Sequence, residues 1–309
     1  MRVIEGLNNS KEIKQPCLVT LGNFDGVHLG HQRIVQELVK RARQSKASSV
    51  LVTFNPHPRK VLDPHTPLQM ITSLEEKIRL VGKLDVDQMV IIPFDLGFSR
   101  ISAESFVRDI LFPSLKFLEL IVGRNFSFGR GRQGNVDLLK RLSVELGYKI
   151  DFVEPVQAGE KVVSSSLIRQ LIHHGNFKEI PKFLGRPYSL FGRVVKGQKM
   201  GKKLGFPTAN LDVGAFILPP RGVYAVRTKV LGEKVLGLAN IGVRPTFTQD
   251  KVLTFEVHLL DFDKDIYGED LEVTFLEYIR DERFFQNQDQ LCQQIEKDIE
   301  GLKRKVSSC

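Results

Sequence analysis

A change of pattern near residue 184 is the feature that most constrains the fold of this chain. Before it, short apolar runs alternate with stretches of helical periodicity, which is typical of an α/β parallel sheet covered by helices. After it, apolar and polar residues alternate in short runs separated by Gly and Pro, which is typical of a small antiparallel β-barrel or sandwich. Because 309 residues exceed what one ordinary domain needs, we predict two domains, residues 1–184 and 185–309.

Local periodicity and turn residues position the individual elements. In the first domain we expect strands at 17–24, 48–54, 87–94, 117–123 and 148–155, and helices at 31–44, 73–84, 103–111, 135–146 and 165–175. In the second domain we expect strands at 188–195, 222–230, 234–242, 254–262 and 270–279, and a C-terminal helix at 287–306.

Charge distribution favours an anionic partner. Most of the net charge of +9 lies in residues 1–184. This positive charge can bind phosphorylated small molecules as well as nucleic acid. The densest basic run, Lys40–Lys46, falls at the end of an expected helix, where a solvated face is the common explanation. We therefore expect small-molecule substrates and no nucleic acid.

Cysteine usage and hydropathy restrict the cellular setting. Cys17, Cys292 and Cys309 are far apart, which argues against a disulfide framework and a zinc cluster. The N-terminal segment is polar, and no uninterrupted apolar run approaches the ~18 residues of a membrane span. We expect a cytoplasmic protein without a membrane partner, present as a monomer or a weak homo-oligomer.

The segment GNFDGVHLGH, Gly22 to His31, joins the first expected strand to the first helix. Open α/β sheets bind ligands at this position, and glycine there lets backbone N–H groups approach a phosphate at a helix N-terminus. His28 and His31 are weaker candidates for a metal site, because a third ligand is missing and Gly30 interrupts the helix. A packed histidine in an ordinary turn is the alternative for either residue alone. The pair together favours phosphate binding.

A second candidate segment, VSSSLIR, begins at Val163. Ser164, Ser165 and Ser166 offer N–H and O–H donors at a helix N-terminus, and Arg169 lies one turn further on. Taken alone, a serine-rich helix start is usually only a cap.

Together these two segments resemble the signatures of the nucleotidyltransferase superfamily. TFNPHP at Thr53 and GRNFSFGRGRQG at Gly123 resemble its bacterial FMN adenylyltransferase branch. The resemblance implies an α/β nucleotidyltransferase-like sheet in which His28, His31 and Arg169 stabilise charge during adenylyl transfer. Its implied ligand contacts are Gly22, Phe24, Gly30, Ser164, Ser165 and Ser166 for ATP, and His57 and Asn125 for flavin. Ser166 and Leu167 stand where threonine and arginine are frequent in that branch.

The stretch GQKMGKKLGFPTANL, Gly197 to Leu211, carries the candidate chemistry of the second domain. It is not a Walker A loop, because the spacing before the lysine is short and no Ser or Thr follows. Pro207 forces an extended backbone, which sets Thr208 and Asn210 on one face. Their oxygens suit a hydrated Mg²⁺ bridging ATP phosphates. The alternative is a turn with two solvent-facing polar residues.

This stretch and four later motifs, NIGVRPTF, TFEVHLLDF, IYGED and YIRDERFF, resemble riboflavin kinases. The resemblance implies that Gly201 and Lys203 cover the ATP phosphates, that Glu256 is the general base and that Arg280 contacts flavin or nucleotide. Strand alternation places Phe255, Val257 and Leu259 on the opposite, apolar face, which leaves Glu256 to face either a ligand or water.

The order of the two resemblances is that of the bacterial bifunctional riboflavin kinase and FMN adenylyltransferase family. The implied reactions are phosphorylation of riboflavin by ATP to FMN, then adenylylation of FMN by ATP to FAD with release of pyrophosphate. A dinucleotide-binding oxidoreductase is one alternative, because residues 129–134 read G-x-G-x-x-G with Asp151 downstream. These glycines, however, stand well past the strand that ends at Gly123. A non-catalytic nucleic-acid-binding protein is the other alternative, and it predicts salt-dependent binding without ATP turnover.

Overall fold

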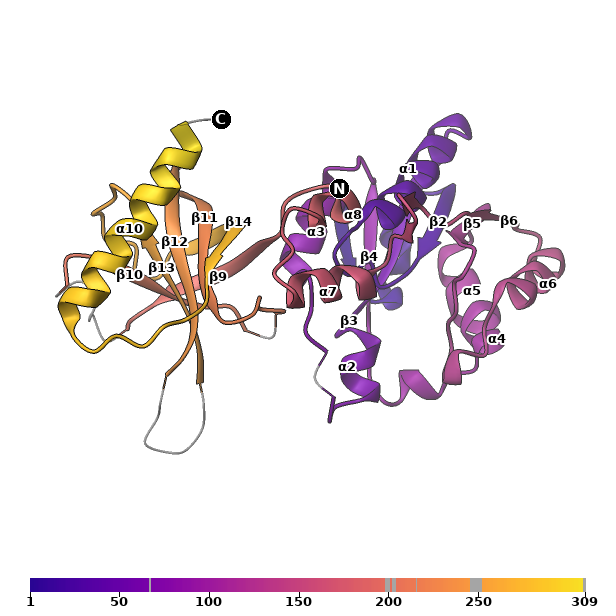
Figure 1. The fold of residues 1–309 in the computed structure, drawn as a ribbon. Coiled ribbons are helices and arrows are strands. Elements are labelled where there is room, and N and C mark those ends of the chain that lie inside the picture. Colours follow the sequence, from indigo (N-terminus) through magenta and orange to yellow (C-terminus); the bar gives the residue numbers. More distant parts are fainter. Residues whose placement is uncertain (67, 198–200, 202–203, 215, 245–251, 308–309) are drawn as a thin grey trace. The chain divides into compact units, whose positions relative to one another are not determined.

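A computed structural model describes residues 1–66, 68–197, 201, 204–214, 216–244 and 252–307. The chain forms two compact units, Met1–Ser165 and Ser166–Cys309, and each is described by itself (Figure 1). The first unit is an α/β structure and the second is built on a closed barrel.

The first unit contains a six-stranded, entirely parallel sheet, as its apolar runs predicted. In sheet order the strands are β1 (Arg2–Glu5), β4 (Gln88–Pro93), β3 (Ser48–Asn55), β2 (Cys17–Leu21), β5 (Glu119–Gly123) and β6 (Lys149–Val153). The chain runs outward from β2 through β3 to β4 and then returns to β5 on the other side of β2. The carboxyl end of β2 is therefore a topological switch point, where such sheets bind ligands.

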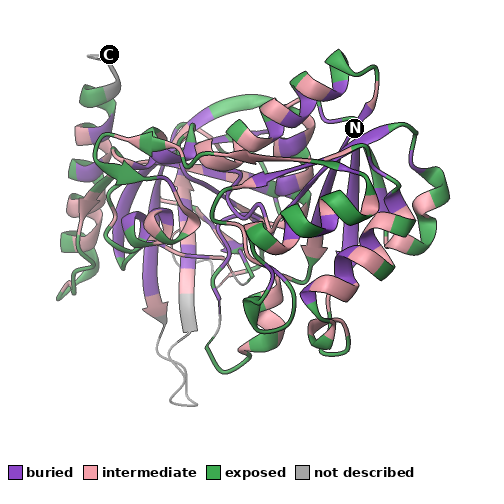
Figure 2. Ribbon diagram, turned by 90° about the vertical axis from the view of Figure 1, so that its right-hand side faces the viewer, coloured by how far each residue is buried: buried purple, intermediate pink, exposed green. Residues whose placement is uncertain are grey.

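Helices cover both faces of this sheet. The helical segments of this unit are α1 (Leu29–Gln44), α2 (Pro58–Leu62), which buries no residue, α3 (Leu74–Gly82), α4 (Ala103–Ser105), a π-helical turn (Phe106–Leu111), α5 (Phe112–Leu115) and α6 (Val136–Leu146). Leu51 packs in one apolar cluster with residues of α1 and α3, whereas Val50 and Val52 pack in another with the segment 106–115 and α6. Successive residues of β3 thus supply opposite faces of the sheet. Figure 2 shows buried strands flanked by helices that are partly exposed.

Short elements complete the unit. They are the 3₁₀ turns Leu7–Glu12, Phe98–Arg100 and Arg130–Arg132, and the hairpin of β7 (Gln157–Ala158) and β8 (Lys161–Val162). Helix α7 (Ser165–His173) begins at the end of this unit and continues into the second, which also contains α8 (Ile180–Leu184).

The second unit confirms an antiparallel barrel rather than a sandwich. The strands close in the order β10 (Thr208–Asp212), β13 (Val252–Leu259), β12 (Glu233–Arg244), β11 (Gly222–Val230), β14 (Asp270–Arg280) and β9 (Ser189–Val195). Helix α10 (Gln288–Ser307) follows the last strand. The sequence predicted only an extended segment at Thr208, but this segment forms β10, which joins β9 to β13 and closes the barrel.

An aromatic contact ties the segment before α8 to the barrel. Phe177 is 5% exposed, and its ring stacks on Phe275 at 5.1 Å between centroids and meets Tyr224 edge-on at 5.5 Å. A fragment cut at the predicted boundary, residues 185–309, lacks this ring. We expect the fragment 175–309 to be more stable in urea by about 3 kcal/mol, the cost of losing a buried Phe side chain. Equal midpoints for both fragments would show that the contact contributes nothing.

Candidate active sites

The loop that follows β2 has a backbone conformation rare for its residue types. Phe24 and Val27 have positive φ values of 50° and 41°, and Gly26 lies between them with φ 86°. A β-branched residue such as Val27 rarely adopts this region, and such strain persists where the surroundings enforce it. The main-chain N of Gly26 donates to Thr72 Oγ1 at 3.0 Å, which supplies part of that enforcement.

The two histidines of this loop stack on each other at the start of α1. His28 is the N-cap, and its Nδ1 accepts a hydrogen bond from the main-chain N of His31 at 3.3 Å. Their ring centroids are 3.6 Å apart with an interplanar angle of 16°. A Cβ on Gly30 would lie 3.2 Å from the His28 ring, so glycine suits this position. The sequence predicted the pair, and the structure shows how the two rings form a single surface.

The surroundings of His31 affect both its hydrogen bonding and its pKa. Its Nδ1 is buried without a hydrogen-bond partner among the described residues. The Phe24 ring lies edge-on to the His31 ring, with 5.2 Å between the two ring centroids. Burial lowers the pKa of His31 well below its ordinary value, with smaller contributions from the charges of His28 and Lys77. The imidazole is therefore neutral near pH 7, and its N–H can donate a hydrogen bond to a phosphate oxygen.

The low pKa of His31 predicts a pH dependence of stability. In the unfolded chain this residue charges near its ordinary pKa of 6.5, but in the folded protein only at lower pH. Below about pH 6.5 the unfolded state therefore binds more protons, and the free energy of unfolding falls by at most about 1.4 kcal/mol per pH unit from this group. Urea unfolding at pH 7.0 and 5.5 should show a smaller loss for His31→Gln than for the parent. Equal losses would contradict the low pKa.

The serine-rich segment that begins at Val163 contacts the histidine loop through Ser165, the first residue of α7. Ser165 Oγ donates to the main-chain O of Asp25 at 3.0 Å, so the start of α7 is tied to the loop. Ser164 directly precedes this helix. Ser166 and Arg169 lie on α7 within the second unit, and their roles in ATP binding stay predictions.

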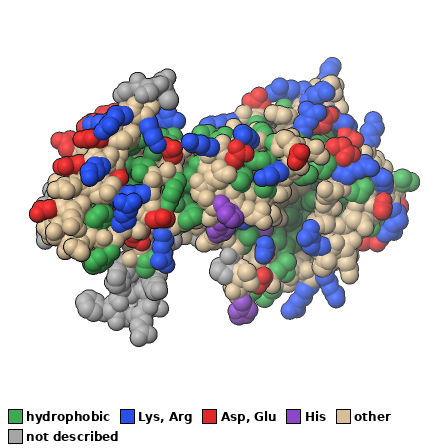
Figure 3. Space-filling view, viewed as in Figure 1, with side chains coloured by type: hydrophobic (Ala, Val, Ile, Leu, Met, Phe, Trp, Pro, Cys, Tyr) green, Lys and Arg blue, Asp and Glu red, His purple; other side chains and the backbone are tan. Residues whose placement is uncertain are grey.

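An apolar cavity of about 450 Å³ opens beside Gly22. Its walls include Phe54, Phe94, Phe98, Phe106, Phe126 and Phe128, together with His57, Arg59 and Arg132. Figure 3 shows hydrophobic side chains in a hollow of this unit, with Lys and Arg nearby. Flat aromatic walls and basic groups suit a planar ring that carries a phosphate.

The predicted flavin contacts differ in their relation to this cavity. His57 is one of its wall residues and caps α2, where its Nδ1 accepts from the main-chain N of Arg59 at 3.1 Å. Asn125 is exposed and is not a wall residue, although Phe126 directly after it is. The phenylalanine cluster was missed by sequence reasoning, and a composition of 21 Phe without Trp was the available signal.

The glycines of the G-x-G-x-x-G segment pack against another element. A Cβ on Gly129 or Gly134 would lie within 2.5–2.7 Å of Ala103 at the start of α4. The main chains of Phe128 and Gly134 form a bridge, so the segment is a closed loop and not a strand-to-helix turn. Close packing accounts for these two glycines without a dinucleotide.

The barrel brings the predicted kinase residues together on two paired strands. Asn210 on β10 faces Glu256 on β13, and Thr208 Oγ1 donates to Glu256 Oε2 at 3.3 Å. Phe255, Val257 and Leu259 are buried, as the alternation predicted, whereas Glu256 is only partly buried. The three polar side chains therefore form one cluster across the β10–β13 pair.

Two glycines of the preceding segment approach this cluster closely. A Cβ on Gly197 would collide with the side-chain amide of Asn210, and one on Gly201 would collide with the main-chain O of Phe206 and lie 3.2 Å from Thr208 Oγ1. Close packing against the Phe206 backbone thus requires glycine at 201, whereas a side chain at 197 would displace the amide of Asn210. Lys203, predicted to act with Gly201, lies outside the described residues.

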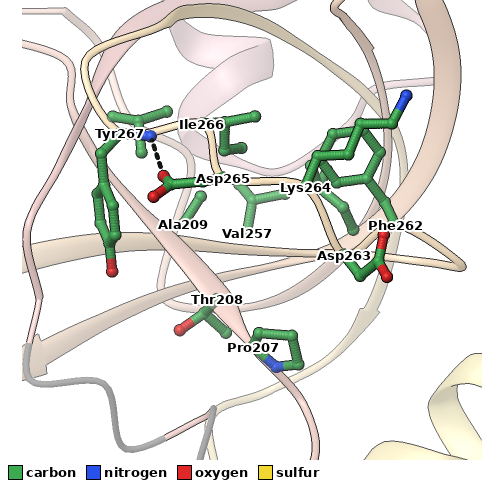
Figure 4. Close-up of a pocket in the computed structure, with 12 residues that line it drawn as sticks. Pro207, Thr208, Ala209, Val257, Phe262, Asp263, Lys264, Asp265, Ile266 and Tyr267 are labelled. Atoms are coloured by element: carbon green, nitrogen blue, oxygen red, sulfur yellow. Dashed lines mark hydrogen bonds between the residues drawn. The ribbon is translucent and has the colours of Figure 1, made fainter.

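Two cavities share Thr208. One, of about 290 Å³, has Ala209 and Val257 at its floor and the loop 262–267 across it, with Thr208 at its edge (Figure 4). The other, of about 360 Å³, lies between the barrel and α10 and includes Thr208 and Glu256 in its walls. A group bound in either cavity can therefore reach the Thr208 hydroxyl.

Arg280, predicted to contact flavin or nucleotide, lies in the wall of the 360 Å³ cavity. Its Nε donates to Asp298 Oδ2 at 2.9 Å, and both side chains are nearly buried. Its guanidinium lies 5.8 Å from the centroid of the Phe285 ring. Asp298 lies on the C-terminal helix α10, so this helix holds Arg280 in place in the cavity wall.

The described part of the chain also bears on metal binding and membrane spanning. No group of three or more His, Cys, Asp or Glu side chains could hold a metal ion there. Within the same residues, no helix is both long and apolar enough to cross a bilayer.

A histidine pair at the switch point of a parallel sheet and a Thr208–Glu256 pair beside a barrel cavity are arrangements that suit an enzyme of nucleotidyl and phosphoryl transfer. Two family models match the chain, FAD synthetase at residues 10–167 and riboflavin kinase at residues 184–306. The curated bifunctional riboflavin kinase/FMN adenylyltransferase of Escherichia coli (strain K12) is 37% identical over 96% of this chain and 96% of its own length. The one from Buchnera aphidicola subsp. Schizaphis graminum is 37% identical over 98% of each.

This chain therefore belongs to the family of bifunctional riboflavin kinase/FMN adenylyltransferases, as its motifs predicted, and it is an enzyme with both activities. A crystal structure described as a macrolide-efflux protein from Streptococcus pneumoniae matches with a TM-score of 0.87 and 32% identity, over 98% of this chain and 99% of that one. That likeness supports the fold, and the description applies to that protein alone.

Proposed function

We propose that riboflavin phosphorylation takes place at Thr208, where the two barrel cavities meet. ATP occupies the 290 Å³ cavity, whose apolar floor suits an adenine ring, and riboflavin occupies the 360 Å³ cavity. The observation that carries this proposal is that the Thr208 side chain borders both cavities and lies 3.3 Å from Glu256. The donor phosphate and the acceptor hydroxyl can thus meet there.

Glu256 is the general base of this reaction. Its carboxylate takes the proton of the ribityl 5′-hydroxyl while the hydroxyl oxygen attacks the γ-phosphorus of ATP, and ADP leaves. Thr208 and Asn210 hold Mg²⁺, which neutralises phosphate charge when it is bound. Gly201 and Lys203 cover the phosphates from the preceding segment.

In the second reaction FMN binds in the aromatic cavity and ATP lies over the histidine loop. The FMN phosphate attacks the α-phosphorus of ATP and pyrophosphate leaves, so the nucleophile is already an anion and needs no base. His28, His31 and Arg169 stabilise the charge that grows on the transferred group, and Gly22, Gly30 and the serine segment bind ATP. His57 and Asn125 contact the flavin.

Separate substitutions in the two barrel cavities test their assignment. Tyr267→Ala removes a half-exposed wall of the 290 Å³ cavity and should raise KM for ATP in riboflavin phosphorylation without changing KM for riboflavin. Leu291→Ala, in the wall of the 360 Å³ cavity, should do the reverse. The opposite pattern would exchange the two assignments, and unchanged constants for both variants would refute them.

Partners and location are proposed from the sequence together with the family's substrates. ATP, riboflavin and FMN are all small molecules, and Mg²⁺ is the divalent ion that ATP carries. We expect a cytoplasmic enzyme that acts as a monomer or a weak homo-oligomer and does not bind nucleic acid.

A further inference from the structure

Lys77 is a buried lysine beneath the histidine loop, and neither reaction assigns it a role. It lies on α3 and is 3% exposed, an unusual position for an ammonium group. Burial lowers its pKa to about 8, and the negative charge of Asp25 opposes that change. Lys77 is therefore mostly protonated near pH 7 and places a positive charge inside the first unit.

One contact connects this charge to the loop backbone. Lys77 Nζ donates to Thr53 Oγ1 at 3.4 Å, near the carboxyl end of β3. Thr53 Oγ1 in turn donates to the main-chain O of Asn23 at 3.2 Å. Lys77 thus acts on the second residue after β2 through a single hydroxyl group.

Asp25 supplies the compensating charge and a second attachment. It is 2% exposed, and its carboxylate accepts hydrogen bonds from the main-chain N atoms of Ile71 at 3.1 Å and Thr72 at 3.2 Å. Its main-chain O accepts from Ser165 Oγ, where α7 begins. Removal of Lys77 would take away a positive charge that interacts with this buried carboxylate, which is unfavourable.

The same ammonium group also acts on His31 through its charge. Three effects lower the pKa of His31. Burial is the largest, the charge of His28 is the second, and the charge of Lys77 is the third. Lys77 therefore acts on both the backbone of the loop and the imidazole that meets the phosphate.

We propose that Lys77 is a positioning residue for adenylyl transfer, whose buried ammonium group, balanced by Asp25, holds the Asn23–Asp25 backbone and the stacked histidines in place for the ATP phosphates. This inference rests on the proposed binding of ATP over the histidine loop. It adds a residue from α3, outside both predicted signature segments, to the site.

Lys77→Met keeps the length of the side chain and removes the charge. It should lower the turnover of FAD formation from supplied FMN by roughly 10²-fold, the effect of a small misplacement at a reacting centre. Riboflavin phosphorylation, measured on the same sample, should stay within twofold. Lys83→Met, an exposed lysine at the end of the same helix, should change neither activity. Lys77→Arg, which keeps the charge, should recover a large part of the loss.

An NMR titration of the His31 ring gives a readout that mere loss of stability does not move. With the Lys77 charge removed, the pKa of His31 should rise toward its ordinary value, whereas Lys83→Met should leave it unchanged. FAD formation by Lys77→Met within threefold of the parent would overturn the inference. So would a folded, impaired variant with an unchanged His31 titration.

Two comparisons separate this inference from the proposed site. If His28→Ala forms FAD at the parental rate, the histidine loop is not the adenylyl-transfer site. If His28→Ala is impaired but Lys77→Met is not, only the role of Lys77 fails. Should Lys77→Met not fold, Lys77→Arg decides, because an active Arg variant supports the charge requirement and an inactive folded one contradicts it.

Discussion

Glu256→Gln is expected to lower the turnover of riboflavin phosphorylation by ~10²- to 10⁴-fold, the usual range for the loss of a general base. The neutral amide has nearly the same shape as the carboxylate and can still accept the hydrogen bond from Thr208, but it is far too weak a base to take the proton of the ribityl hydroxyl. Riboflavin and ATP binding should be largely retained, so the loss should fall on kcat at saturating Mg-ATP.

Two control measurements accompany the Glu256→Gln prediction. FAD formation from supplied FMN should remain near the parental rate, since Glu256 belongs to the barrel. Glu296→Gln, an exposed residue on α10, should leave both activities unchanged. Kinase turnover of Glu256→Gln within about threefold of the parent would mean that Glu256 is a partly exposed strand residue and not the base.

His28→Ala is expected to lower FAD formation from supplied FMN by roughly 10²- to 10³-fold, by analogy with the loss of one donor to a developing anion. The substitution removes the ring that stacks on His31 and the N-cap that fixes the start of α1. Turnover should be measured with saturating FMN and Mg-ATP, and pyrophosphate release should fall in parallel.

Riboflavin phosphorylation by the same variant should hardly change. His65→Ala, an exposed histidine of the same unit, provides the matched control and should retain both activities. A fall of both activities in a well-folded His28→Ala protein would contradict a local role, because it would mean that the histidine supports the structure or that the sites are coupled.

The fold was predictable where a segment carries its own pattern. Strand β11 occupies the expected residues 222–230, because a buried apolar run, Gly222 to Val226, continues into alternating exposed and buried positions up to Val230. Strand β1, Arg2–Glu5, was missed since only Ile4 is buried and pairing with β4 defines the strand. The helix expected at 103–111 extends through a π-helical turn to Leu115, and such a change depends on packing.

The same distinction between local sequence pattern and tertiary packing applies to the active-site residues. The histidine loop and the Thr208–Asn210 pair were predictable, because their groups are neighbours in the sequence. The aromatic cavity was not, since its rings come from segments as distant as Phe54 and Phe128. Lys77 looks like any solvated lysine of an amphipathic helix, and only the packing of α3 beneath the loop shows that it is buried.

The central claim is that one chain carries out two successive ATP-dependent reactions on flavin at two separate sites. Its most direct test is a time course with riboflavin, ATP and Mg²⁺ in which riboflavin, FMN and FAD are separated by chromatography. We predict that the parent forms FMN and then FAD, that His28→Ala stops at FMN, and that Glu256→Gln forms FAD only from added FMN. If either variant loses both products while it remains folded, or if the parent forms neither, the claim of two separate sites is wrong.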